Sequence, residues 1–454
     1  MSFRAGAPDR TPACQKTMDM KKTLLLSAAL LILAACGCGK PQTLPVIHTE
    51  DLANAPTELL SLPATARDNW QIYQVNLKLY GSSGAFKKVE ARLDDIKALG
   101  TEILYLMPVY PEGKEKAIGS PYCVKDFKGV NPDYGTLAEL KSLVDAAHAK
   151  GMKVMFDWVA NHTAWDNVWI KDHPAWYEHK ADGSIAWPTK DGEWKDVAQL
   201  DYSNKELWAA MEDALEYWVK TLDIDGYRCD YAHGVRDDFW KEAIGRLKAL
   251  KPGFIMLAES DFERMFDDGF DIIFDRAMKS RMRTLFNAGK ASDFASWYKE
   301  DQNAAPAPKT KLHFVTNHDD ATEAAPASQF KSKEGALAAY VLMAALNGSA
   351  MIYGSQETGY DKVINFFNTM TMDWNADATL TKSYREAMQS LSKVDRSGAV
   401  KIYGLDGLVI VAYPKSVIAV NTTASAVGVN LSKVASKLGE KESIPGYGYK
   451  IWNL

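Results

Sequence analysis

The sequence predicts an α/β protein built on a (β/α)8 TIM barrel, with a short excursion domain after the third strand and a small antiparallel β domain at the carboxyl end. Eight short β-rich runs alternate with amphipathic helical segments between residues 68 and 395. This alternation is typical of a parallel sheet, and eight strands suit a closed barrel. From residue 396 to 454 alternating apolar and polar residues replace the helical spacing, which indicates a separate β unit.

The strands and helices follow from the period of their apolar residues. Strands are predicted near residues 72–80, 103–107, 154–156, 226–230, 255–259, 272–274, 313–316 and 351–353. One helix is expected over 85–99, and capping boxes at Thr136 with Glu139 and at Ser203 with Glu206 begin two more. The segment 159–200 contains five tryptophans and has no clear period, so we expect a functional loop or a small domain there.

The composition indicates a globular protein with a large core. Of the 454 residues, 47% are hydrophobic and 24% are charged. The formal net charge of −5 argues against a nucleic-acid partner, because such proteins carry clustered basic surfaces. The five cysteines show no metal-binding spacing. The sequence makes no prediction of oligomeric state.

Residues 1–36 have the features of a leader with a lipoprotein signal peptide. A basic pair precedes the apolar run 24–35, which is too short to span ~30 Å of hydrocarbon as a helix. The run ends in Leu-Ala-Ala-Cys36, which resembles a bacterial lipobox, although an ordinary signal peptide containing a cysteine is the alternative. The prediction is export to the bacterial cell envelope, on the periplasmic or outer-membrane side, with acylated Cys36 as the membrane anchor. A linker or N-terminal segment is expected over 37–67.

Polar side chains stand at the ends of several predicted strands. In a barrel of this kind the active site lies at the carboxyl ends of the strands. Asp230, Glu259 and Asp319 each follow a different strand, so three carboxylates should reach the same rim. Because strand side chains alternate, Arg228 shares the lumen face with Asp230 and should lower the pKa of that carboxyl, whereas Cys229 faces the helices as a core residue.

Paired carboxylates of this kind can break a glycosidic bond. In the retaining mechanism two carboxyl groups ~5–5.5 Å apart act as nucleophile and as acid/base. From the pattern alone, structural ion pairs and ligands of a catalytic metal are equally good interpretations.

Four segments taken together resemble glycoside hydrolase family 13, the α-amylase family, over most of residues 68–454. They are Asp157-Trp-Val-Ala-Asn-His162, Gly226-Tyr-Arg-Cys-Asp230, Glu259 and Asn317-His-Asp319. The resemblance implies a barrel with its excursion at 159–200 and a carboxy-terminal β domain at 396–454. It also implies a retaining α-glucoside hydrolase that acts on α-glucans or maltodextrins through a covalent glycosyl-enzyme intermediate.

The resemblance assigns a role to each matching residue. Asp230 would be the nucleophile, Glu259 the general acid/base and Asp319 the transition-state stabiliser. The substrate-binding residues would be Tyr122, His162, Arg228 and His318. No cofactor is required for this chemistry.

The sequence departs from the family pattern at two places. The Lys-His pair that many members carry after the nucleophile is replaced by His233-Gly234. Many members also bind a structural calcium through the residue at Asn161 and an aspartate where this chain has Gln199. Calcium favours anionic oxygen ligands, so Asn161 and Gln199 make a poor site for it.

Two alternatives to hydrolysis stay open. A transglycosylase would use the same acids but pass the sugar to another hydroxyl. A non-catalytic glucan-binding lipoprotein is disfavoured because all three acids are present.

Overall fold

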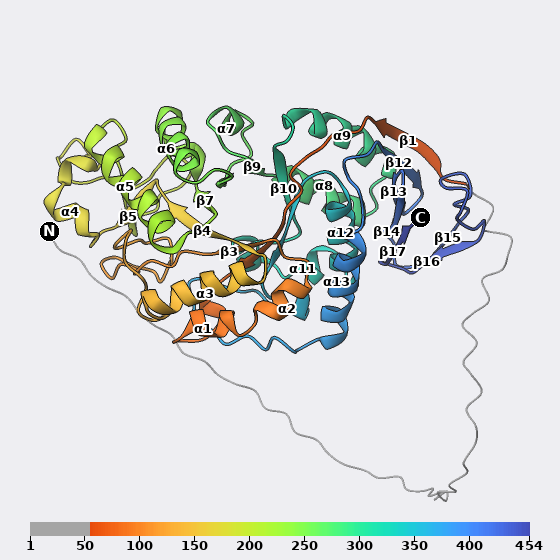
Figure 1. Ribbon diagram of the computed structural model, residues 1–454, viewed down its shortest axis with the longest axis horizontal. Coiled ribbons are helices and arrows are strands. Elements are labelled where there is room, and N and C mark those ends of the chain that lie inside the picture. Colours follow the sequence, from red (N-terminus) through yellow and green to blue (C-terminus); the bar gives the residue numbers. More distant parts are fainter. Residues whose placement is uncertain (1–54) are drawn as a thin grey trace, which may run out of the picture. The chain divides into compact units, whose positions relative to one another are not determined.

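The computed structural model describes residues 55–454, so the predicted leader, Cys36 and the first part of the predicted linker lie outside the described residues. Its centre is a closed barrel of eight parallel strands, which confirms the predicted fold class (Figure 1). In order around the barrel the strands are β2 (Gln71–Val75), β3 (Ile103–Leu106), β4 (Lys153–Val159), β7 (Gly226–Asp230), β8 (Ile255–Ala258), β9 (Ile272–Phe274), β10 (Thr310–Phe314) and β11 (Ser349–Tyr353).

Along each barrel strand, successive side chains point alternately into the lumen and toward the surrounding helices. Leu312 and Phe314 of β10 belong to the apolar cluster that fills the lumen. On β7, Tyr227 points outward instead, where its hydroxyl donates to the Leu215 carbonyl at 2.7 Å. Cys229 is likewise fully buried on the outer side, as predicted.

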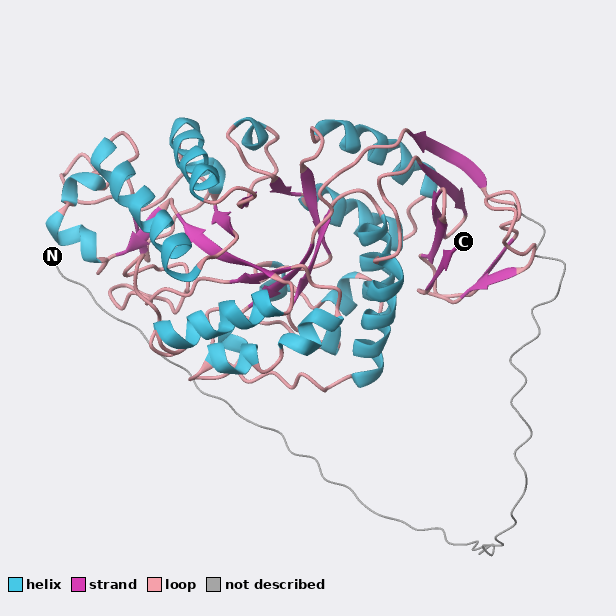
Figure 2. Ribbon diagram, in the orientation of Figure 1, coloured by secondary structure: helices cyan, strands magenta, loops and turns pink. Residues whose placement is uncertain are grey.

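Helices follow most of the barrel strands and cover the outside of the barrel (Figure 2). Those between the barrel strands are α1 (Ala85–Glu90), α2 (Leu93–Ala98), α3 (Leu137–Ala149), α4 (Val168–Asp172), α5 (Lys205–Leu222), α6 (Asp237–Leu250), α7 (Arg264–Asp267), α8 (Arg276–Phe286), α9 (Ala291–Ala304), α10 (Asp320–Glu323), α11 (Pro326–Gln329) and α12 (Lys333–Ala345). The last helix, α13 (Ala378–Leu391), follows β11.

Two helix predictions are wrong in detail. The single helix expected over 85–99 is two short helices, because the chain leaves helical geometry at Arg92. The capping box at Thr136 and Glu139 is confirmed at the start of α3. At α5, however, the cap is Asn204 and not Ser203, since the Asn204 side chain accepts from the Glu206 amide. Asparagine is as good an N-cap as serine, so the motif alone did not distinguish the two residues.

The excursion between β4 and β7 contains a two-stranded antiparallel ribbon, β5 (His162–Ala164) with β6 (Val197–Gln199). Most of the segment between them has no regular structure, which agrees with its lack of period. The ribbon matters for the site because it pairs His162 directly with Gln199.

An antiparallel sheet follows the barrel, in the order β1 (Thr57–Leu62), β12 (Val400–Leu405), β13 (Leu408–Tyr413), β14 (Ser416–Asn421) and β17 (Tyr449–Asn453). A second ribbon joins β15 (Val427–Val429) to β16 (Glu442–Ile444). Residues 57–62 of the predicted linker or N-terminal segment form the edge strand β1, which the sequence analysis did not predict. This strand carries few buried residues, so its apolar signal in the sequence is weak.

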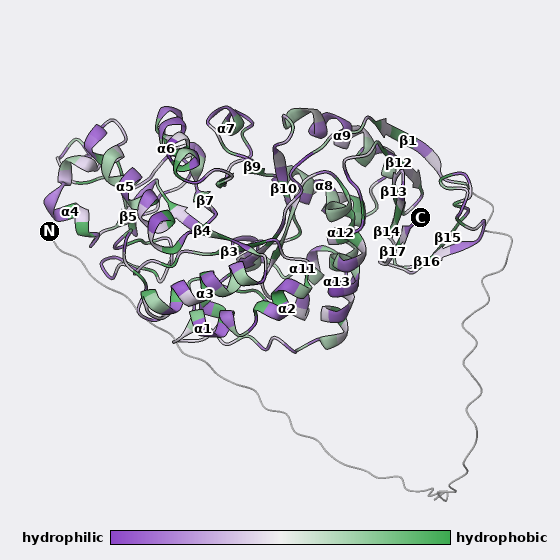
Figure 3. Ribbon diagram, in the orientation of Figure 1, coloured by the Kyte–Doolittle hydropathy of each residue, from purple (hydrophilic) through white to green (hydrophobic). Residues whose placement is uncertain are grey.

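Helix α12 lies between the barrel and this sheet and contacts β10, β11 and β14. All its residues from Gly335 to Ala345 are buried, and Figure 3 shows hydrophobic residues over much of its surface. Across residues 55–454, no helix combines the length and apolar character needed to cross a membrane.

Candidate active site

The three predicted carboxylates come together at the carboxyl ends of the barrel strands. Asp230 is the last residue of β7, Glu259 directly follows β8, and Asp319 follows β10 at the start of α10. All three line one pocket of about 350 Å³, together with Tyr122, His162 and His318. Six of the seven predicted catalytic and substrate-binding residues therefore lie around a single cavity.

The seventh residue, Arg228, lies beneath the pocket and is completely buried. Its Nη1 donates to Asp157 at 2.7 Å and to Asp230 at 3.0 Å, and its Nη2 lies 2.9 Å from Glu259 Oε2. One guanidinium thus contacts both Asp230 and Glu259. Charge-assisted contacts of this kind fix the position of both carboxylates.

The pKa of Asp230 differs from the value expected from its contact with Arg228 alone. Burial raises the pKa of Asp230 well above its ordinary value, and the charge of Arg228 only partly opposes that rise. Arg228 therefore acts in the predicted direction, but burial outweighs it, and the guanidinium is also shared with Asp157 and Glu259.

Glu259 has two further donors that the sequence analysis did not identify. Arg276, the first residue of α8, donates from Nη2 to Glu259 Oε1 at 2.8 Å and from Nη1 to Asp261 at 2.7 Å. The Tyr231 amide donates to Glu259 Oε2 at 3.0 Å, from a residue with φ of +42°. Arg276 follows a strand end as the other site residues do, which is the signal that would have found it.

Tyr122 and His318 form a hydrogen-bonded wall of the pocket. Their rings stack with centroids 5.2 Å apart, and the Tyr122 hydroxyl contacts His318 Nε2 at 2.7 Å. The hydroxyl also donates to Asp157 at 2.9 Å, while Gln74 contacts His318 Nδ1 at 2.9 Å. Burial lowers the pKa of His318 well below its usual value, so the ring is neutral and one of its nitrogens accepts.

His162 lies on the excursion side of the pocket. Burial lowers its pKa to about 4, so it is a neutral hydrogen-bonding group near neutral pH. Trp194 packs edge-on against His162 at 5.7 Å and against Tyr231 at 4.9 Å. Of the five excursion tryptophans, Trp194 alone lines this pocket. The pocket lining also includes Phe366, which packs against Tyr122 and His318 and which the sequence analysis did not single out.

The replacement of the family's Lys-His pair has a steric cause. A Cβ at Gly234 would lie 2.1 Å from the Tyr231 ring, so the space taken by a side chain there is occupied by Tyr231. The Tyr231 hydroxyl in turn donates to Asp191 of the excursion. The Tyr231 ring thus occupies the space beside Asp230 and Gly234.

The oxygens around Asn161 do not fit a calcium ion. Gln199 Nε2 donates to the Asn161 carbonyl at 2.9 Å, to Asn161 Oδ1 at 3.3 Å and to the Leu200 carbonyl at 3.0 Å. An amide nitrogen therefore satisfies three oxygens that a cation would otherwise bind. Asn161 and Gln199 also provide no carboxylate, and calcium prefers anionic oxygen ligands.

Comparison with known proteins gives consistent results. A family model described as alpha amylase, catalytic domain, matches residues 61–193. An alpha-1,4-glucan:maltose-1-phosphate maltosyltransferase from Rhodospirillum rubrum is 33% identical over 203 residues, which cover 40% of this chain and 29% of the relative. Alpha-amylase MalA from Haloarcula japonica is 27% identical over 319 residues, which cover 65% of this chain and 45% of the relative. The chain thus spans less than half the length of these two relatives.

A solved α-amylase from Lactobacillus plantarum has a TM-score of 0.75 and 29% identity, covering 85% of this chain and 99% of that one. A closed parallel barrel with three carboxylates around one pocket at its carboxyl end is a glycosidase-type (β/α)8 domain. Together, these matches support membership of the α-amylase family, glycoside hydrolase family 13.

Proposed function

We propose that this protein is a retaining glycoside hydrolase that cleaves α-glucans or maltodextrins. The observation that carries the proposal is the contact of one buried guanidinium with both Asp230 and Glu259, beside a pocket that Asp319 also lines. A shared guanidinium holds the two carboxyls beside one cation, which is compatible with the short separation of ~5–5.5 Å that retention needs.

In this proposal Asp230 attacks the anomeric carbon while Glu259 protonates the leaving oxygen. The C–O bond breaks as the bond to Asp230 forms, and water then releases the sugar after giving a proton to Glu259. Asp319 supplies negative charge to the oxocarbenium-like transition state. Tyr122, His162 and His318 contact the bound sugar ring.

The test is product analysis with starch, pullulan and maltoheptaose, with the anomeric configuration of the first product followed by proton NMR. Release of α-configured maltodextrins supports the proposal. An initial product of β configuration would contradict retention, and absence of turnover on all three would contradict the substrate class.

Replacing Glu259 with glutamine should affect substrates unequally. Starch has a poor leaving group and needs protonation, so we expect turnover to fall ~10²–10⁴-fold. An activated aryl α-maltoside needs little protonation and should lose much less in its glycosylation step. Equal losses on both substrates, measured by pre-steady-state kinetics, would count against the acid/base assignment.

Glycosyl transfer is the second candidate function. The maltosyltransferase named among the relatives and the ring of Tyr231 in place of a basic side chain support it. An aromatic surface beside the nucleophile suits an acceptor sugar better than it suits water. Mass spectrometry of maltotriose incubations distinguishes the two, because transfer yields products longer than the substrate.

We further propose that the enzyme works without the calcium site typical of its family. Added calcium should leave the melting temperature and kcat of the parent protein unchanged. Replacing Gln199 with aspartate supplies an anionic ligand beside Asn161, so calcium should raise the melting temperature of that variant alone. A calcium-dependent shift in the parent protein, measured by differential scanning calorimetry, would contradict the proposal.

The envelope location is also a proposal, supported by the residues Leu-Ala-Ala-Cys36. Incorporation of labelled palmitate into the parent protein, but not into Cys36→Ser, is the expected result. Labelling that survives the substitution would count against the anchor.

A further inference from the structure

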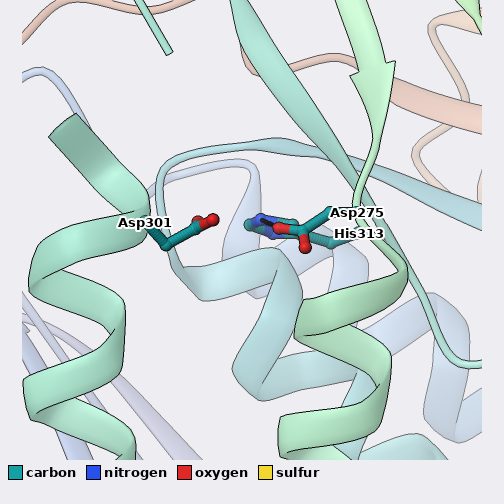
Figure 4. Close-up of side chains that lie close together, drawn as sticks. All are labelled: Asp275, Asp301 and His313. Carbon is teal, nitrogen blue, oxygen red and sulfur yellow. Dashed lines mark ion pairs between the residues drawn. The ribbon is translucent and has the colours of Figure 1, made fainter. Parts of the chain in front are cut away.

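A second cluster of ionisable side chains lies away from the pocket, in the layer between the barrel and its helices. It consists of Asp275 at the junction of β9 and α8, Asp301 on α9 and His313 on β10. Since Leu312 and Phe314 face the lumen, His313 between them faces the helices. Figure 4 shows the Asp301 carboxylate directed from its helix toward the Asp275 carboxylate and the His313 ring.

Each of the three side chains has one polar atom already bonded to a neighbour. Asp275 Oδ1 accepts from the Met278 amide at 2.8 Å, and Asp301 Oδ1 accepts from Lys311 at 2.6 Å. His313 Nδ1 lies 3.1 Å from the Met343 carbonyl, to which it can only donate. These outer contacts fix each side chain in place and leave His313 Nε2 as the acceptor nitrogen.

The other polar atom of each side chain has no partner. Asp275 Oδ2, Asp301 Oδ2 and His313 Nε2 are all buried and without a hydrogen bond among the described residues. The cluster offers one ligand atom from each residue within 4.8 Å of the others, and His313 Nε2 lies 3.6 Å from Asp275 Oδ2. This distance between Nε2 and Oδ2 is too long for a hydrogen bond. It is close to the ~3.4 Å that separates two ligand atoms bound tetrahedrally at ~2.1 Å from the same ion.

We propose that Asp275, Asp301 and His313 bind a divalent transition-metal ion, with zinc as the best fit. One imidazole nitrogen and two carboxylate oxygens form a mixed donor set that suits zinc. Water can complete the coordination shell. The residues come from three consecutive parts of the barrel, so the ion would clamp α9 to β10 and to the start of α8.

The electrostatics of the cluster support a cation. Two carboxylates face each other in a buried space, and the ammonium of Lys311 forms an ion pair with only one of them, Asp301. Arg67 and Arg396 lie near enough for their charges to act on the cluster, but within residues 55–454 neither donates a hydrogen bond to its three unpartnered atoms.

The surrounding backbone makes room for the histidine. Gly348 has φ of +154°, and a Cβ there would lie 2.3 Å from His313 Cε1. Helix α9 also contacts β1 and β12 of the carboxy-terminal sheet, so an ion at Asp301 would stabilise the packing of this sheet against the barrel helices. The role assigned to the ion is structural, because the cluster lies on the outer side of β10 and does not line the pocket.

The test uses the tag-free full chain, stripped with a chelator and titrated with ZnCl₂ by calorimetry. One equivalent should bind, and a 100-fold excess over Kd should raise the melting temperature by about 3 °C. In Asp301→Asn, which keeps the side-chain volume and an acceptor for Lys311, zinc affinity should fall ~100-fold. His148→Gln, which alters a surface histidine paired with Asp225 at 2.7 Å, is the matched control and should bind as the parent does.

X-ray absorption at the zinc edge of the parent protein tests the ligands without any variant. One imidazole nitrogen with oxygen neighbours is expected. A shell containing sulfur or several imidazoles, a protein that binds no zinc, or unchanged zinc affinity in Asp301→Asn would each overturn the proposal. None of these outcomes bears on glucan cleavage, so the two proposals fail independently.

Discussion

Replacing Asp230 with asparagine is expected to lower kcat on maltoheptaose by at least ~10⁴-fold while the protein stays folded. Asparagine has the same shape but cannot form the covalent bond to the anomeric carbon. It also still accepts from Arg228, which contacts Asp230 at 3.0 Å, so the pocket should keep its geometry. Steady-state kinetics together with a melting curve measure both expectations.

The matched control is Asp225→Asn, because Asp225 directly precedes the same strand at its opposite end. Its carboxylate binds His148 and the Val154 amide, at 2.7 and 2.8 Å, and is far along β7 from the pocket. We expect a lower melting temperature with kcat little changed. Comparable loss of kcat in both variants would mean that the strand, and not the nucleophile, accounts for the effect.

Azide separates the nucleophile from the acid/base. In Asp230→Ala, azide can enter the space left by the carboxylate and displace fluoride from an α-maltosyl fluoride, giving a product of inverted configuration. In Glu259→Ala the glycosyl-enzyme still forms, and azide attacks it to give a retained product. The opposite pattern of products would exchange the two roles.

The barrel and the positions of its three acids could be predicted because each depends on a local pattern. Apolar runs such as 272–274 begin and end at the predicted residues, and the acids follow their strands directly. The alternation of Arg228 and Tyr227 fixed which side chain faces the lumen. These features need only the strand period and the rule that barrel sites lie at carboxyl ends.

The features that were missed depend on contacts between distant segments. Strand β1 is recognisable only by its pairing with β12, some 340 residues later, because its own sequence buries little. Arg276 is a site residue only because its side chain reaches Glu259. Arg228 shares its charge among three carboxylates, Asp157, Asp230 and Glu259, which come from different parts of the chain. The orphaned atoms of Asp275, Asp301 and His313 likewise have no signature in spacing.

Replacing Arg228 with methionine is expected to lower the free energy of unfolding by ~3–5 kcal/mol. Methionine fills similar volume but leaves Asp157, Asp230 and Glu259 facing one another without their shared cation. By contrast, Lys150→Met removes a surface ion pair with Asp94, whose side chain is 88% exposed. This substitution should lower the free energy of unfolding by less than ~1 kcal/mol. Urea unfolding of both variants measures the difference.

The loss in Arg228→Met should also depend on pH, in a direction that identifies its cause. Burial already raises the pKa values of Asp157 and Asp230 in the folded state, and without the opposing charge of the guanidinium these pKa values should rise further. Groups with raised folded-state pKa values stabilise the fold when protonated and lose that contribution as pH rises. The deficit should therefore be largest near pH 7 and smaller near pH 5. A deficit that is the same at both values would indicate lost packing, since methionine differs from arginine in shape as well as in charge.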